Sequence, residues 1–143
     1  RQLCTDHGAD LAVDHHDPEH FERALRFTDG HGVKILLEML ANANLGQDLK
    51  IMAKKSEIVI IGSRGPVEID PRRLMVREIT VHGLLTSLAT PAERQEAYAA
   101  IAKGLSDGTL DPVIAEQMPL GDAPRAHHTI IESAHHGKIV LIP

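Results

Sequence analysis

Two runs of aliphatic residues, separated by roughly the length of one helix, constrain the fold of this chain more than any other feature. The first run begins at Val33 and ends at Leu40, and its part up to Glu38 is expected to form a buried strand. The second runs from Ile58 to Ile61. Parallel strands carry such continuous apolar sequence when helices cover both faces of their sheet. With a helix expected near residues 45–52, the runs predict a βαβ unit.

The rest of the chain repeats this alternation of strands and helices. Three helix starts are indicated by a capping residue followed by proline, at Asp17-Pro18, Asp70-Pro71 and Thr90-Pro91. Further strands are expected at residues 9–14, 79–84, near 113–114 and at 138–142, and a last helix at 123–132. This order predicts an α/β protein with a three-layer, mostly parallel, Rossmann-like sheet. A length of 143 residues is typical of one domain.

Composition excludes several classes of partner. The formal net charge is −5 and aromatic residues make up 2% of the chain, so nucleic acid binding is not expected. No apolar stretch reaches the ~18 residues of a transmembrane helix. Cys4 is the only cysteine, which excludes an internal disulfide and a thiolate metal site. We therefore expect a cytoplasmic protein that does not bind membranes.

The end of the second apolar run offers a ligand site. Gly62 and Ser63 follow Ile61 and would place bare backbone and a hydroxyl at the carboxyl edge of the sheet, where α/β proteins bind ligands. Arg64 adds a fork of donors suited to a phosphate or a carbonyl oxygen. On the tetrapeptide alone, an ordinary turn with a solvated arginine is the alternative.

Three stretches, in this order and at these separations, resemble one family. They are EMLANANL from Glu38 to Leu45, IGSRG from Ile61 to Gly65, and GKIVL from Gly137 to Leu141. The chain is similar over essentially its whole length to zinc-free quinone oxidoreductases of the zeta-crystallin type, in the medium-chain dehydrogenase/reductase superfamily. The resemblance implies transfer of a hydride from NADPH to a quinone, bound between this domain and an N-terminal catalytic domain.

The resemblance also implies which residues contact the cofactor. Positions matching Asn44 and Ile61, Gly62, Ser63 and Arg64 line the nicotinamide end of the NADP(H) site, and the position matching His15 lies near the adenosine ribose and its 2′-phosphate. From the residues alone, Asn44 also fits a helix N-cap and His15 an ordinary loop histidine. We find no convincing acid, base or nucleophile and expect no catalytic residue in this chain.

The resemblance does not extend to every part of the family's proteins. The glycine-rich phosphate turn and the catalytic domain would lie upstream of Arg1, so residues 1–143 are expected to be part of an NADP-binding domain. The alternative is a non-catalytic remnant that serves as an oligomerisation or binding module. The resemblance further implies a homo-oligomer formed through the edge strand from Ile79 to Leu84.

Histidine pairs at positions 15–16, 127–128 and 135–136 raise the possibility of a metal site. Side chains of adjacent residues are expected to point apart, and no ligand spacing such as His-Glu-x-x-His occurs. We therefore expect no metal.

Overall fold

The computed structural model describes residues 1–132 and 136–143, and His135 lies outside them. The chain divides into two compact units, Arg1–Leu88 and Ala89–Pro143, each of which is described here by itself. Among the described residues, no helix has the length and apolar character needed to cross a membrane.

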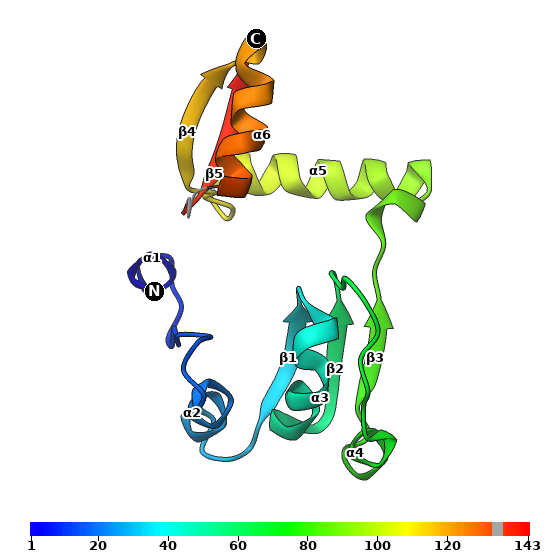
Figure 1. The fold of residues 1–143 in the computed structure, drawn as a ribbon. Coiled ribbons are helices and arrows are strands. Elements are labelled where there is room, and N and C mark those ends of the chain that lie inside the picture. Colours follow the sequence, from blue (N-terminus) through cyan, green and yellow to red (C-terminus); the bar gives the residue numbers. More distant parts are fainter. Residues whose placement is uncertain (133–135) are drawn as a thin grey trace. The chain divides into compact units, whose positions relative to one another are not determined.

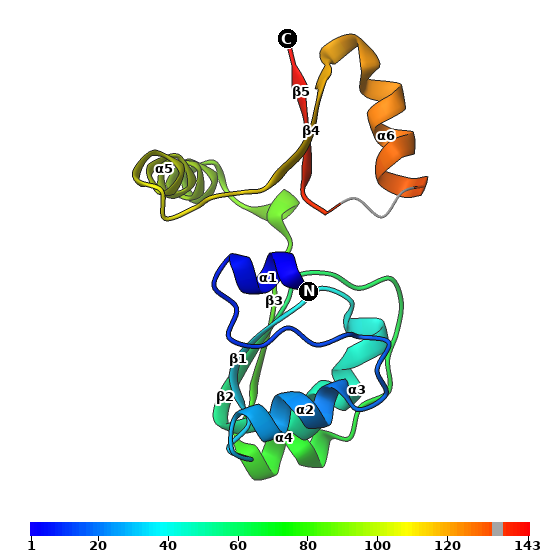
Figure 2. The ribbon, with the colours of Figure 1, turned by 90° about the vertical axis from the view of Figure 1, so that its left-hand side faces the viewer.

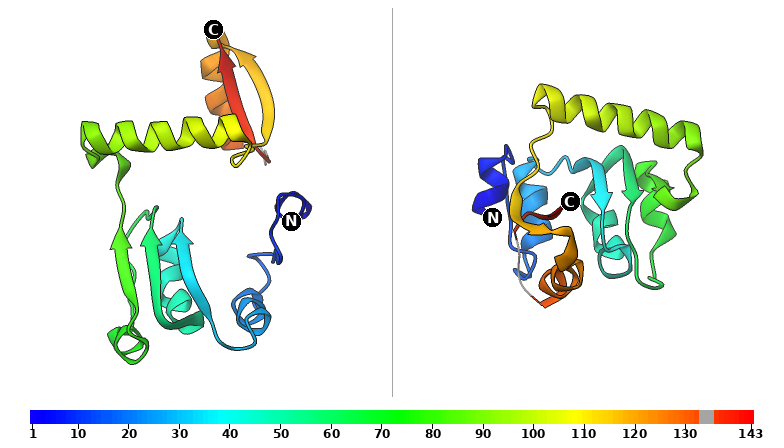
Figure 3. Two further views of the ribbon diagram at one scale, coloured as in Figure 1. Left: turned by 180° about the vertical axis from the view of Figure 1, so that it is seen from behind. Right: turned by 90° about the horizontal axis from the view of Figure 1, so that it is seen from above.

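The first unit is built on a three-stranded parallel sheet, in the order β1-β2-β3. Its strands are β1 (Val33–Glu38), β2 (Met52–Ile60) and β3 (Thr80–Gly83), all parallel and side by side in Figures 1 and 3. Leu36 pairs with Ile58, which pairs in turn with Val81. The α/β class and the parallel pairing of the two apolar runs are therefore confirmed.

Two crossover helices connect these strands. α3 (Ala41–Ile51) joins β1 to β2, and α4 (Pro71–Arg77) joins β2 to β3. The Asp70 carboxylate caps α4 by accepting a hydrogen bond from the backbone N–H of Arg72 at 3.0 Å, as the Asp-Pro pair predicts. α1 (Gln2–Asp6) and α2 (His20–Phe27) precede the sheet. Figure 2 shows α2, α3 and α4 on one side of it.

The core of this unit lies between α3 and the sheet. Leu45 and Leu49 of α3 pack with Met52 and Ile58 of β2, and both Leu49 and Ile58 are fully buried. The opposite face of β1 is open, since Ile35 is 69% and Leu37 62% exposed. The continuous apolar run predicted helices over both faces, whereas the described residues cover one.

Two strands of this unit differ from the sequence-based expectation. Residues 9–14 form no strand, because no ladder pairs with them among the described residues. β2 begins at Met52, six positions before the expected start at Ile58. The first part of β2 lacks a regular apolar pattern because the pairing register between β1 and β2 shifts there. The shift lies between the pairs Val33↔Met52 and Ile35↔Glu57, and Lys55 within it has a φ of 54°.

The second unit holds a separate pair of parallel strands, where the sequence predicted a single sheet. These are β4 (Ile114–Pro119) and β5 (Lys138–Ile142), joined through the short 3₁₀ turn η2 (Leu120–Asp122) and α6 (Ala123–Glu132). Met118 of β4 and Ala126 of α6 are the buried apolar residues of this unit among those described. α5 (Pro91–Asp107) begins with a reciprocal capping box between Thr90 and Glu93 and ends at Gly108, whose φ is 77°. A further 3₁₀ turn, η1 (Thr86–Leu88), closes the first unit.

Truncation of Leu49 tests where the core lies. The Leu49→Ala variant removes a fully buried side chain and leaves a cavity between α3 and the sheet, so it should lower the free energy of unfolding by about 2–5 kcal/mol. Met75→Ala on α4 is the matched control, because its side chain is 75% exposed. Chemical denaturation of both variants measures the difference, and equal stabilities would contradict this assignment of the core.

Candidate functional site

The carboxyl ends of the strands meet at one edge of the three-stranded sheet, because the strands are parallel. β1 ends at Glu38 and β2 at Ile60, and the backbone N–H of Ile61 donates to the carbonyl of Glu38 at 2.8 Å. The N–H of Leu84 donates to the carbonyl of Ile60 at 3.0 Å. In α/β proteins this edge is the usual place for a ligand.

The segment after β1 and the loop after β2 are bonded to each other at this edge. The N–H of Ala41 donates to the carbonyl of Gly62 at 2.9 Å, and the N–H of Arg64 donates to Oδ1 of Asn42 at 2.7 Å. A Cβ at position 62 would overlap the backbone carbonyl of Met39. Glycine is therefore required at this position by close packing of two backbones, and the two segments meet at the carboxyl edge of the sheet.

Asn44 lies inside α3, one turn from the edge. Its Nδ2 donates to Oε1 of Glu38 at 3.3 Å, and the helix N-cap is Leu40, so the N-cap interpretation of Asn44 is wrong. A carboxylate oxygen only accepts hydrogen bonds, which directs the NH₂ group of the amide toward Glu38. The Oδ1 atom of Asn44 therefore remains an acceptor for another group.

The remaining predicted residues of the loop are exposed. The Ser63 hydroxyl donates to the carbonyl of Gly65 at 3.0 Å, which folds the loop into a tight turn. The guanidinium of Arg64 forms no hydrogen bond or ion pair within the part of the chain that the structure describes. Ile61 is 37% exposed. The loop thus presents an apolar side chain, bare backbone and an exposed cation at the carboxyl edge.

His15 lies elsewhere in the first unit, in the exposed turn before α2. Within the described residues, no hydrogen bond or ion pair joins it to Asn44 or to the loop at 61–65. Its ring centroid is 3.9 Å from that of His16, so the expectation that adjacent histidines point apart is wrong for this pair. Asp14 accepts a hydrogen bond from the backbone N–H of His16, and this bond is the main cause that lowers the pKa of Asp14.

A buried pair of acids beneath the edge was missed by the sequence analysis. Glu38 is 5% and Asp48 is 2% exposed, and the Oδ2 atom of Asp48 has no hydrogen-bond partner among the described residues. Burial, a hydrogen bond to Glu38 and its negative charge together raise the pKa of Asp48 to about 7. The sequence does carry a sign of this pair. Glu38 ends an apolar strand, and Asp48 follows ten positions later on the helix that covers this strand.

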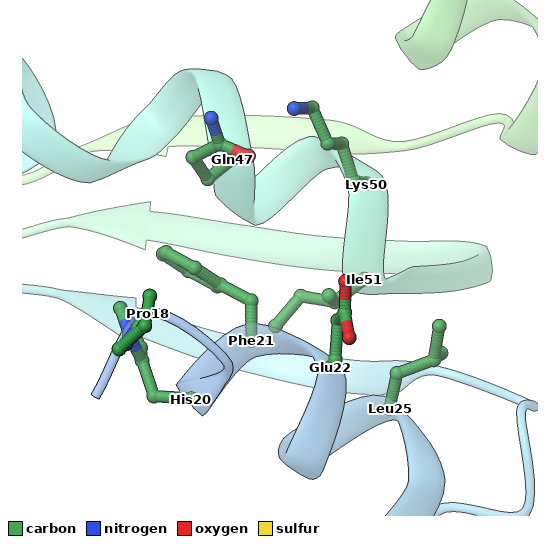
Figure 4. A pocket seen from close by; sticks show the side chains of 8 residues that line it. All are labelled: Pro18, His20, Phe21, Glu22, Leu25, Gln47, Lys50 and Ile51. Atoms are coloured by element: carbon green, nitrogen blue, oxygen red, sulfur yellow. The ribbon is translucent and has the colours of Figure 1, made fainter. Parts of the chain in front are cut away.

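A hollow between α2 and α3 is a different feature of the first unit. Figure 4 shows Phe21 and Leu25 of α2 facing Gln47 and Lys50 of α3, with Ile51 between them. None of the residues predicted to contact the cofactor lines it. The candidate site is therefore the carboxyl edge.

Comparison with known proteins identifies the family. The model of the zinc-binding dehydrogenase family matches residues 7–141. The chain belongs to this family. It is 33% identical over 143 residues to a quinone oxidoreductase of Homo sapiens, and 34% identical over 146 residues to one of Mus musculus. Each match covers 99% of this chain and 44% of the relative, so the chain spans less than half the length of these proteins.

Solved structures show the same fold. A mycobacterial quinone oxidoreductase superposes with a TM-score of 0.80 at 26% identity, covering 99% of this chain and 45% of that one. A mycobacterial protein complexed with NADPH superposes with a TM-score of 0.79 at 23% identity, covering 99% and 46%. The Rossmann-like fold and the resemblance to quinone oxidoreductases are confirmed by these matches.

The family description raises the question of zinc. The chain has one cysteine, Cys4, which is exposed. Within the described residues, the only group of three ligand side chains whose ligand atoms lie within 4.8 Å of one another is Asp14, His15 and His16. These are consecutive exposed or half-buried residues, and Asp14 is already bonded to the backbone of His16. This set does not fit the closed tetrahedral geometry of a structural zinc site.

Substitution of Gly62 tests the close approach at the edge. Gly62→Ala should force the carbonyl of Met39 away and break the bond between Ala41 and Gly62, at a cost of about 1–3 kcal/mol in unfolding free energy. The matched control is Gly65→Ala in the same loop, where an added Cβ meets no atom within 4 Å. Denaturation curves measure both, and a stable Gly62→Ala variant would contradict the packing described.

Proposed function

We propose that this chain forms part of the cofactor-binding domain of an NADPH:quinone oxidoreductase of the zeta-crystallin type, which works without zinc. The observation that carries the proposal is the joined pair of loops at the carboxyl edge, with Asn44 and Arg64 beside the packed Gly62. The quinone oxidoreductases of mammals to which the chain is similar support the choice of substrate.

Each predicted contact has a chemical role in this proposal. Asn44 offers Oδ1 to a ribose hydroxyl while Glu38 holds its NH₂ group. Ile61 and the bare backbone at Gly62 and Ser63 provide a flat, partly apolar wall, and Arg64 provides donors for a phosphate or carboxamide oxygen. His15 is proposed to contact the 2′-phosphate of NADP(H). When bound, the cofactor supplies the hydride, while the protein orients it and excludes water.

Backbone NMR of the isolated chain tests the proposed cofactor edge. Adding NADPH should shift the amide resonances of residues 42–44 and 61–65. We expect a dissociation constant in the millimolar range, which corresponds to a binding free energy of roughly −4 kcal/mol. Weak binding is expected because a net charge of −5 gives no attraction to a polyanionic cofactor. Arg64→Ala should weaken binding by roughly ten- to a hundredfold, since a charge-assisted bond contributes roughly 1.5–3 kcal/mol.

Arg72→Ala on α4 is the control for this titration, because its side chain forms no ion pair within the described residues. Shifts confined to other regions, or equal affinity in both arginine variants, would refute the site. A complete absence of shifts would favour the non-catalytic binding module instead.

The proposal includes self-association through residues 79–84. β3 is one of the two outer strands of the sheet and all four of its residues are exposed, so among the described residues one side of its backbone is open to pair with a second copy. Light scattering at high protein concentration should show a dimer or larger species. Val81→Lys should weaken association, because a charge on an edge strand opposes pairing, whereas Val76→Lys on α4 should not. A monomeric wild-type protein would contradict the proposal.

A further inference from the structure

Three polar side chains meet beneath the candidate cofactor edge. Asn44 and Asp48 are four residues apart on α3 and so lie on one face of the helix, and Glu38 closes the adjacent strand β1. Oε1 of Glu38 accepts hydrogen bonds from the backbone N–H of Leu40 and from Nδ2 of Asn44. A hydrogen bond to Glu38 is among the causes that raise the pKa of the Asp48 carboxyl.

We propose that Glu38 and Asp48 share one proton and act together as positioning residues, which fix Asn44 and the start of α3 for the ligand. The role toward the cofactor rests on the function proposed above. The proton-sharing pair itself rests on the burial of both acids and on the hydrogen bonds at Glu38, and it does not depend on the cofactor.

Hydrogen-bonding partners decide which acid holds the proton. Two carboxylates in contact and out of water cannot both stay ionised without a large cost. Two N–H donors already point at Glu38, so a carboxylate there is stabilised by the protein. Within the part of the chain that the structure describes, Asp48 has no such donor, and its Oδ2 is buried and unpartnered. Asp48 therefore holds the proton and donates its O–H to Glu38, in agreement with its raised pKa.

This arrangement sets the orientation of the Asn44 amide. As long as Glu38 is a pure acceptor, Asn44 must turn its NH₂ group inward and its Oδ1 outward. Loss of the Asp48 proton puts a second negative charge beside Glu38 and removes one of its donors. The repulsion then loosens the contact that fixes Asn44 and the backbone at Leu40.

No other charge of the surrounding elements compensates for the pair. Within the described residues, Glu38 is the only titratable group that affects the pKa of Asp48. The charged side chains of the surrounding elements have other partners. On the sheet, Lys34 donates to the carbonyl of Lys54, and Glu57 pairs with His82. On the helices, Arg77 of α4 donates to the carbonyls of Leu49 and Lys50, and Arg23 and Arg26 of α2 pair with Asp17, Glu19 and Glu22. Lys50, on α3 itself, is exposed, as are Glu68 and Arg64 of the loop after β2.

The sign of the pH effect follows from the raised pKa. Between the ordinary value of 3.8 and about 7, the folded chain keeps a proton that the unfolded chain has released. Stability therefore falls as the pH rises through this window and levels off above it. Between pH 5 and pH 8, this single site should lower the folding equilibrium constant by on the order of a hundredfold.

The Asp48→Asn variant of the full chain is the first test. An asparagine donates an N–H to Glu38 at every pH, so the variant should lose the hundredfold decline relative to wild type, as measured by urea denaturation at pH 5 and pH 8. Asp10→Asn is the control, because Asp10 is exposed and forms no hydrogen bond or ion pair within the described residues. Parallel profiles for wild type and Asp48→Asn would overturn the pair.

Two measurements on folded protein complete the test. Infrared spectra of wild type should show a protonated carboxylic acid band at pH 6, where ordinary carboxyl groups are almost fully ionised, and this band should disappear toward pH 8. Its absence at pH 6 overturns the proposal even if Asp48→Asn does not fold. The side-chain NH₂ resonances of Asn44 should shift over the same range in wild type and stay constant in Asp48→Asn. Unchanged resonances in wild type refute the positioning role. If all these results hold but NADPH shifts no edge resonance, the proposed function fails while the pair stands.

Discussion

The packing of α3 across β1 and β2 is the contact on which the first unit depends. Two neighbouring parallel strands require a crossover, and α3 provides it while burying Leu45 and Leu49 against Ile58. The same crossover places the first turn of α3 at the carboxyl edge, beside the loop that leaves β2. A single set of apolar contacts therefore builds the core and brings the candidate ligand residues together.

Close packing at that edge then limits what the two loops can be. The backbone of Met39 lies against Gly62, and the bonds from Ala41 and Arg64 tie the start of α3 to the second loop. These backbone contacts hold the start of α3 and the loop after β2 in fixed positions relative to each other. A site of this kind is pre-organised by main-chain contacts.

Local signals in the sequence predicted the elements that local chemistry determines. The strand Val33–Glu38 and the caps at Asp70 and Thr90 were found because apolar runs and capping residues act within a few positions. The separate β4-β5 pair and the missing strand at 9–14 were not found, because strand pairing depends on segments far apart in the chain. The start of β2 was hidden by a shifted ladder with charged residues on its exposed positions.

The same distinction explains what was missed in the site. Resemblance pointed to Asn44 and to the loop from Ile61 to Arg64, but it could not show that Glu38 and Asp48 are buried together, because burial arises only when helix and strand pack. An apolar pair at these positions would avoid the cost of burying charge, but it would leave the N–H of Leu40 and the NH₂ of Asn44 without an acceptor. One shared proton resolves the conflict, because it removes a charge while keeping every acceptor that the two donors need. The acids are thus best understood as the support that gives Asn44 a single orientation, at the expense of stability above neutral pH.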